Sequence, residues 1–131
     1  MSARAWRSTA VALLLALIGW QLVWHVWLAP PASLPLGFVL GLALPALLVP
    51  LLMMGRNLIR GLFWAGFMAL GYFTHGVMEA WATPELRMLA NVQWVLATLL
   101  ILAVGAAGMA ERRARRAKAD AETKPESNAT A

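Results

Sequence analysis

Four long apolar stretches constrain this chain more than any other feature of its sequence. They fill most of residues 6–110, and each is long enough to cross the hydrocarbon layer of a bilayer, which takes about 20 residues of helix. Hydrophobic residues make up 61% of the 131 residues and charged residues only 13%. In soluble domains, apolar residues average about 45–50% and charged residues about 25%. We therefore expect an all-α integral membrane protein, folded as one four-helix bundle.

The expected transmembrane domain covers residues 1–110, with helices over 6–28, 34–54, 61–81 and 84–110. Prolines mark the outer junctions, because proline cannot continue the ladder of backbone hydrogen bonds. Ser33 is the expected N-cap of the second helix. Gly55-Arg56-Asn57 is the expected turn before the third. Thr83 can cap the fourth helix, and Pro84 suits its first position.

The first helix could instead be a cleaved signal peptide, because Arg4 and Arg7 precede an apolar run. The run is too long for a typical signal core, and we favour a retained helix. Tryptophans near its end fit an aromatic belt at the headgroup level. The interfacial aromatic residues are predicted to be Trp20, Trp24, Trp27 and Trp81.

Small residues indicate where helices could approach closely. Gly37 and Gly41 form a GxxxG pair, which can admit a neighbouring backbone, although the two glycines could also merely relieve crowding. Gly76 is assigned to helix packing as well. Pro45 and Pro50 should kink the second helix.

Basic residues predict the orientation, because Lys and Arg accumulate on the cytoplasmic side of membrane helices. With four spans, one side holds Arg4, Arg7, Arg56, Arg60, Arg112, Arg113, Arg115, Arg116, Lys118 and Lys124. The other side holds only Arg87. The prediction is N-in and C-in. The basic run after the fourth helix is interpreted as a topology anchor on anionic headgroups, the alternative being a dedicated docking site for lipid or protein.

Residues 111–131 form an expected cytoplasmic tail, basic at first and disordered from 119 onward, because its second part has no hydrophobic face. The net charge of +5 does not indicate a nucleic-acid-binding protein, since the basic residues flank hydrophobic blocks. Cysteine is absent, so the chain has no disulfide, thiolate metal ligand or cysteine nucleophile.

Polar side chains recur at one predicted depth. At about 1.5 Å per residue, three helices place such groups about 10 Å inside their outer ends. We therefore infer a polar pocket that opens toward the outside. Its candidate lining residues are Gln21, His25, Tyr72, His75, Glu79 and Asn91. His75 and Glu79 are one turn apart and could hydrogen-bond directly.

Several interpretations of this pocket remain open. The favoured one is that its groups satisfy one another and lock the bundle, or lie near headgroups. Proton or solute handling is a second. A zinc site of His25, His75 and Glu79 would have suitable ligand types, and the two histidines could in principle hold a haem, but no metal or cofactor is expected.

The stretch Tyr72-Phe73-Thr74-His75-Gly76-Val77-Met78-Glu79-Ala80-Trp81 resembles the domain of unknown function 2069 family. These are small predicted inner-membrane proteins of Gram-negative bacteria. A Trp-x-x-Trp motif at Trp24 and Trp27 and a proline-rich loop after it are also similar. The resemblance covers roughly residues 10–112 and implies the four-helix layout and an inner-membrane location. It makes Tyr72, His75, Gly76, Glu79 and Trp81 the residues to test.

The expected function is that of a non-catalytic accessory or structural protein of the envelope, because no catalytic spacing is evident. The alternative is a small transporter or proton-linked carrier that works as an oligomer. The expected partners are the lipid bilayer and either a second copy of the chain or another membrane protein.

Overall fold

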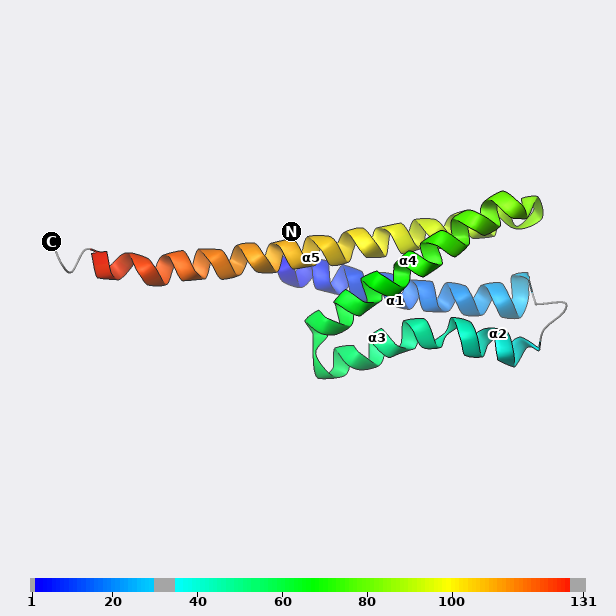
Figure 1. Cartoon of the computed structure of the whole chain (residues 1–131), viewed down its shortest axis with the longest axis horizontal. Coiled ribbons are helices and arrows are strands. Elements are labelled where there is room, and N and C mark those ends of the chain that lie inside the picture. The colour runs from blue at the N-terminus through cyan, green and yellow to red at the C-terminus, as the bar shows by residue number, and fades with distance from the viewer. Residues whose placement is uncertain (1, 30–34, 128–131) are drawn as a thin grey trace.

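The computed structural model describes residues 2–29 and 35–127, and its regular elements in these ranges are all helices (Figure 1). They are α1 (Ala3–Val23), the π-helical η1 (Trp24–Leu28), α2 (Leu36–Ala43), α3 (Pro45–Arg56), α4 (Leu58–Ala82), the 3-10 turn η2 (Pro84–Leu86) and α5 (Arg87–Ser127). The expected cap at Ser33 lies outside the described residues.

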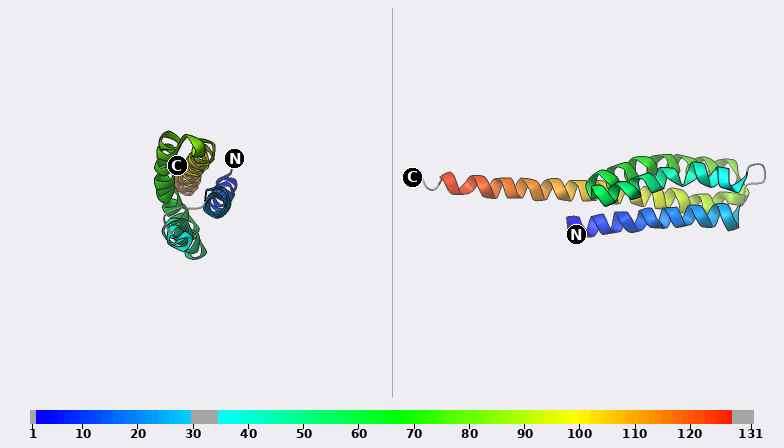
Figure 2. Two further views of the ribbon diagram at one scale, coloured as in Figure 1. Left: turned by 90° about the vertical axis from the view of Figure 1, so that its right-hand side faces the viewer. Right: turned by 90° about the horizontal axis from the view of Figure 1, so that it is seen from below.

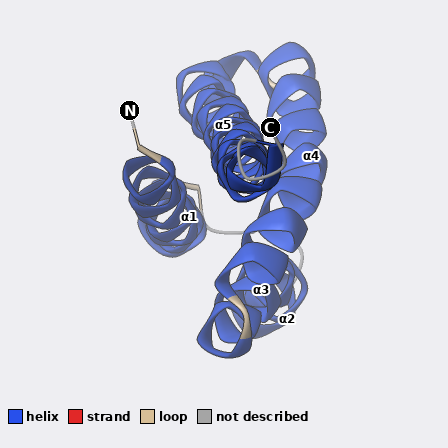
Figure 3. Cartoon of the chain, turned by 90° about the vertical axis from the view of Figure 1, so that its left-hand side faces the viewer, coloured by secondary structure: helices blue, strands red, loops and turns tan. Residues whose placement is uncertain are grey.

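α5 is the central helix of the bundle. It packs against both α1 and α4, and α3 packs against α4 and also contacts α1 (Figures 2 and 3). α2 contacts α3 and η1. The N-terminus and the α3–α4 turn lie at one end of the bundle, and the last turns of α5 project past that end (Figure 1).

The α3–α4 connection is a single residue, Asn57. Its side-chain Oδ1 accepts from the Arg60 amide at 3.1 Å, so it caps α4 rather than belonging to a three-residue turn. The predicted start of this helix at 61 is therefore late. Gly61 is required by the tight turn, because a Cβ there would lie 2.7 Å from the Met54 backbone nitrogen.

The second expected helix is broken rather than continuous. α2 and α3 meet at Leu44 with a bend of 45°. Pro45 opens α3, where its missing amide proton is least costly. Pro50, the other predicted kink, lies buried within α3.

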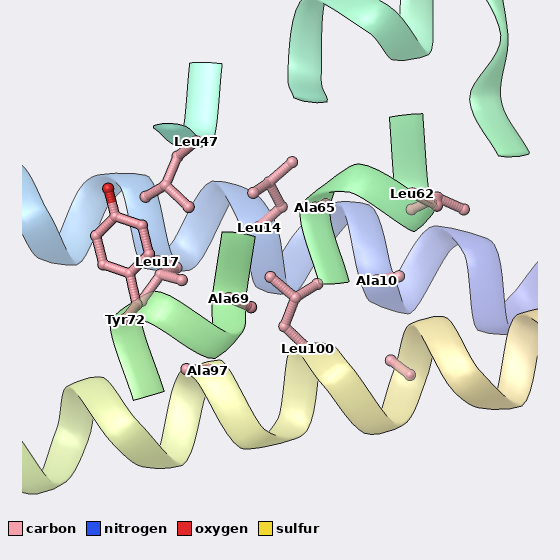
Figure 4. Packing of buried hydrophobic residues seen from close by; sticks show 11 residues of the cluster. Ala10, Leu14, Leu17, Leu47, Leu62, Ala65, Ala69, Tyr72, Ala97 and Leu100 are labelled. Carbon is pink, nitrogen blue, oxygen red and sulfur yellow. The ribbon is translucent and has the colours of Figure 1, made fainter. Parts of the chain in front are cut away.

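Buried side chains form a seam along each long helix. On α1 and the first residue of η1 the buried positions are Ala10, Leu14, Leu17, Gln21 and Trp24, at alternating intervals of four and three. This spacing keeps one stripe of a helix facing its neighbours. The α5 seam includes Ala90, Gln93, Ala97, Leu100 and Ala103. Figure 4 shows Ala65 and Ala69 of α4 near Ala97 and Leu100 of α5, and the small alanine side chains let the two backbones approach closely.

Gly76 lies in a close contact between two helices, whereas Gly37 and Gly41 have open space beside them. A Cβ at Gly76 would lie 3.0 Å from the Trp94 nitrogen and 3.2 Å from the Ala90 oxygen. A Cβ at Gly37 or Gly41 would meet nothing within 4 Å. Among the described residues of one chain, the two glycines of the GxxxG pair are therefore not in close contact with another helix.

Two helical stretches are long and apolar enough to cross a membrane: Ala3–Leu28 and Pro84–Glu122. The bent pair α2 and α3 makes a third if it counts as one span. α4 has 25 residues but is not among these candidates. Its glycines and polar side chains lower its hydropathy, so four crossings stay a prediction.

The tail differs from the expectation of disorder. α5 continues to Ser127, and only 128–131 of the expected tail lie outside the described residues. The reason is local: after Gly108 the chain is rich in alanine, arginine and lysine, which are strong helix formers. Glu111 with Arg115 and Lys118 with Glu122 form ion pairs one turn apart.

Replacing Gly76 by alanine should destabilise the protein by about 1–3 kcal/mol, because the new methyl group overlaps the Trp94 backbone and one helix must move. Gly71→Ala is the matched control on the same helix, with nothing within 4 Å of its Cβ. Unfolding by SDS in mixed micelles measures the stability of both variants. Equal stability of the two variants would contradict the close α4–α5 contact.

Candidate functional site

Three polar side chains occupy positions in the buried seams at one level of the bundle. Gln21 on α1 is 1% exposed, Tyr72 on α4 is 8% exposed and Gln93 on α5 is 0% exposed. Each replaces an apolar residue in an otherwise apolar stripe. The polar layer predicted from the sequence is therefore present in part, with Gln93 as a member that the pocket prediction omitted.

Tyr72 joins α4 to the break between α2 and α3. In a regular helix the Leu47 amide would donate to the Ala43 carbonyl. Here it donates to the Leu44 carbonyl at 3.0 Å, and the Tyr72 hydroxyl donates to Ala43 instead. A buried carbonyl without a partner is costly, above all in hydrocarbon. The hydroxyl thus satisfies a group that the bend has exposed.

Gln93 extends this connection to α5. Its Nε2 donates to the backbone carbonyl of Tyr72 at 3.1 Å. The sequence does contain a signal for this residue, since Gln93 lies on the same helical face as the buried Ala90 and Ala97. The pocket prediction omitted Gln93 because it grouped polar residues by their depth along the helices and not by the helical face on which they lie.

A cavity of about 430 Å³ lies beside this layer, between α1, η1, α2, α3 and α4. Its polar lining consists of Gln21, His25, Tyr72 and His75. Apolar side chains of α2 and α3, including Phe38 and Leu42, form much of the rest. Four of the six residues predicted from the sequence therefore line one cavity.

Gln21 leaves this cavity with an unused hydrogen-bonding group. Its backbone oxygen lies 2.9 Å from His25 Nδ1, within one turn. Its side-chain Oε1 is buried and has no hydrogen-bond partner among the described residues. An unpaired buried acceptor costs about 1–3 kcal/mol, so Gln21 is a polar side chain of the cavity wall whose Oε1 the described chain leaves unsatisfied.

His25 and His75 both lie beside the indole ring of Trp24. The ring centroid of Trp24 lies 6.1 Å from that of His25 and 6.4 Å from that of His75. Trp24 is 4% exposed, so its ring packs inside the bundle. η1 ends α1 as a wide π turn, a feature that often occurs at functional sites.

Glu79 and Asn91 lie outside this cavity, contrary to the prediction. Glu79 accepts from the Thr83 hydroxyl at 2.8 Å near the end of α4, and within the described chain no hydrogen bond joins it to His75. Asn91 accepts from Trp94 Nε1 at 2.9 Å. It lines a second cavity of about 460 Å³ between α4 and α5. A similar depth in the bundle did not place Asn91 in the polar cavity, because α4 separates the two cavities.

The metal interpretation loses its basis in this arrangement. In residues 2–29 and 35–127, no three His, Cys, Asp or Glu side chains are gathered closely enough to hold a metal ion. His25, His75 and Glu79 are thus not a ligand set.

The remaining tryptophans of the predicted belt differ in placement. Trp27 and Trp81 lie on the surface of the bundle, 75% and 89% exposed, and their interfacial position stays a prediction. Trp20 is partly buried, and its Nε1 has no hydrogen-bond partner in the described part of the chain. Its ring packs edge-on against Trp24 at 6.4 Å.

The basic residues gather at the opposite end from the polar cavity. Arg4 and Arg7 start α1, Arg56 and Arg60 flank the α3–α4 turn, and the basic run of α5 leaves the bundle there (Figure 1). Arg7 forms an ion pair with Glu111, which ties α1 to α5 at this end. The sequence analysis did not predict this pair.

A family model described as "Predicted membrane protein (DUF2069)" matches residues 9–112. The chain belongs to this family. The match confirms the resemblance carried by residues 72–81 and covers the chain from within α1 to within α5. No curated protein and no solved structure matches the chain.

Tyr72→Phe should lower the free energy of unfolding by about 0.5–2 kcal/mol, because the Ala43 carbonyl loses its donor at the break. Thr74→Val is the matched control, since the Thr74 hydroxyl bonds to the Leu70 carbonyl of its own helix at 2.9 Å. Detergent-resistance melting curves would compare the two. A Tyr72→Phe protein as stable as Thr74→Val would refute the role of this hydroxyl.

Proposed function

We propose that this protein is a non-catalytic accessory protein of the bacterial inner membrane, and that it associates with another membrane protein through the cavity beside the polar layer. The observation that carries the proposal is the placement of His75 and Gln21. His75 is exposed at the wall of this cavity, and the Gln21 Oε1 there is buried without a partner. Polar groups at membrane depth are costly unless protein or water covers them.

Other polar side chains of the layer already have structural partners. Tyr72 bonds to Ala43, Gln93 bonds to Tyr72, and Glu79 bonds to Thr83. Such bonds between helices stabilise membrane bundles. The open cavity is therefore the proposed recognition site, and an apolar segment with a polar group that pairs with the exposed His75 could fill it.

The proposed topology has four crossings with both ends in the cytoplasm. Basic residues concentrated at the end that holds the N-terminus, the α3–α4 turn and the exit of α5 support it. On this topology, the polar cavity opens in the outer half of the membrane, and Trp27 and Trp81 lie at the outer headgroups.

The double variant Gln21→Leu/His75→Leu should lose the partner in affinity recovery from native membranes followed by mass spectrometry. Its stability should stay within about 1 kcal/mol of wild type, because leucine replaces an unpaired amide. Asn91→Leu, in the other cavity, is the control and should retain the partner. An unchanged set of recovered proteins in the double variant would contradict the proposal.

A proton-linked carrier is the second candidate, and the specific observation that favours it is the pair of histidines on one cavity of about 430 Å³. Reconstituted vesicles distinguish the two functions. An accessory protein gives proton flux equal to that of empty vesicles. Flux above that level, abolished in the Gln21→Leu/His75→Leu variant, would establish the carrier and refute the accessory role.

A further inference from the structure

A separate cavity lies at the basic end of the bundle. It has a volume of about 380 Å³ and is enclosed by the start of α4, the exit of α5 and Arg7 of α1. Its inner wall is apolar and includes Phe63 and Val104. Its charged lining consists of Arg7, Glu111, Arg112 and Arg115. Apolar and charged surfaces thus adjoin in one concavity.

Glu111 organises the charged part of this cavity. One carboxylate oxygen accepts from Arg7, and the other lies 3.5 Å from Arg115 Nε. A guanidinium group carries five N–H donors. Each arginine therefore keeps most of its donors for another anion. Three positive groups against one negative group leave the cavity with a net charge of +2.

An amphiphilic anion fits this pairing of surfaces better than a soluble one does. A free phosphate ion would use the arginines but gain nothing from the apolar wall. Phe63 is 65% exposed, so the wall continues onto the outer face of the helix, which faces lipid if the bundle is embedded. Basic pockets between helices on the cytoplasmic side of a membrane are known to bind acidic headgroups.

We propose that this cavity is a binding site for an anionic phospholipid. The phosphodiester group binds between Arg112 and Arg115, and an acyl chain lies along Phe63 and Val104. The site is independent of the association proposed above, because it lies at the other end of the bundle and shares no lining residue with the polar cavity.

General attraction of a basic helix to acidic lipid is the competing explanation, and the sequence contains its own control. Arg113 and Arg116 belong to the same run of α5 but do not line the cavity. Arg112→Gln/Arg115→Gln and Arg113→Gln/Arg116→Gln each remove two positive charges from this helix. A specific site makes the two pairs unequal, whereas general attraction makes them equal.

Native mass spectrometry of the purified full-length protein in detergent, titrated with phosphatidylglycerol, tests the site. Wild type should retain one phosphatidylglycerol and no phosphatidylcholine at the same concentration. Arg112→Gln/Arg115→Gln should bind about tenfold more weakly, and Arg113→Gln/Arg116→Gln within about twofold of wild type. Phe63→Ala should also weaken binding, and this single exposed change keeps the test valid if the double variant fails to fold.

Three results would overturn the proposal. The first is equal weakening by the two double variants, or no weakening by either. The second is equal retention of phosphatidylcholine. The third is displacement of the lipid by an equal concentration of sn-glycerol 3-phosphate, which carries the anionic group without the acyl chains.

Discussion

Backbone groups inside hydrocarbon have no water to bind, so each must find a partner within the protein. The break between α2 and α3 is where this chain meets that constraint most severely. The break leaves Ala43 without its usual helical donor, and Tyr72 supplies one from the neighbouring helix. Gln93 then donates to the Tyr72 carbonyl. Two side chains thus connect the bent pair, α4 and α5 in one series of hydrogen bonds.

The same bend shapes the polar cavity. α3 packs along α4, whereas α2 turns by 45° and makes its contacts with α3 and η1. The space between α2 and α4 is left to the cavity, whose polar wall comes from α1, η1 and α4. The hydrogen bond of the break and the cavity therefore share one layer: Tyr72 donates to the Ala43 carbonyl, and Gln21 and His75 line the cavity beside it.

Much of the fold was predictable because proline, asparagine and the length of apolar runs act locally. The junctions at Pro45 and Thr83 and the close packing at Gly76 follow from such local chemistry. The helical tail could also have been predicted, since residues 109–124 contain neither glycine nor proline. The expectation of disorder considered only the missing hydrophobic face.

The site was less predictable, because depth along a helix does not fix the direction of a side chain. Gln21 and Gln93 are found by following the three- and four-residue intervals of the seams, and Asn91 is excluded by the same reasoning. Glu79 continues the interval after Gly76, but it lies near the end of α4 and bonds to Thr83. The ion pair of Arg7 with Glu111 joins residues 104 positions apart. No local pattern reports such a contact.

Placement of the two ends of the bundle on opposite faces of a bilayer is the central claim. The chain has no cysteine, so single cysteines can report accessibility directly. Gly55→Cys and Glu85→Cys probe the α3–α4 and α4–α5 turns, and both positions are exposed. In spheroplasts treated with a membrane-impermeant maleimide, we predict labelling of the cysteine at 85 at once and of the cysteine at 55 only after lysis. Equal labelling of both before lysis, or the reverse order, would contradict the account.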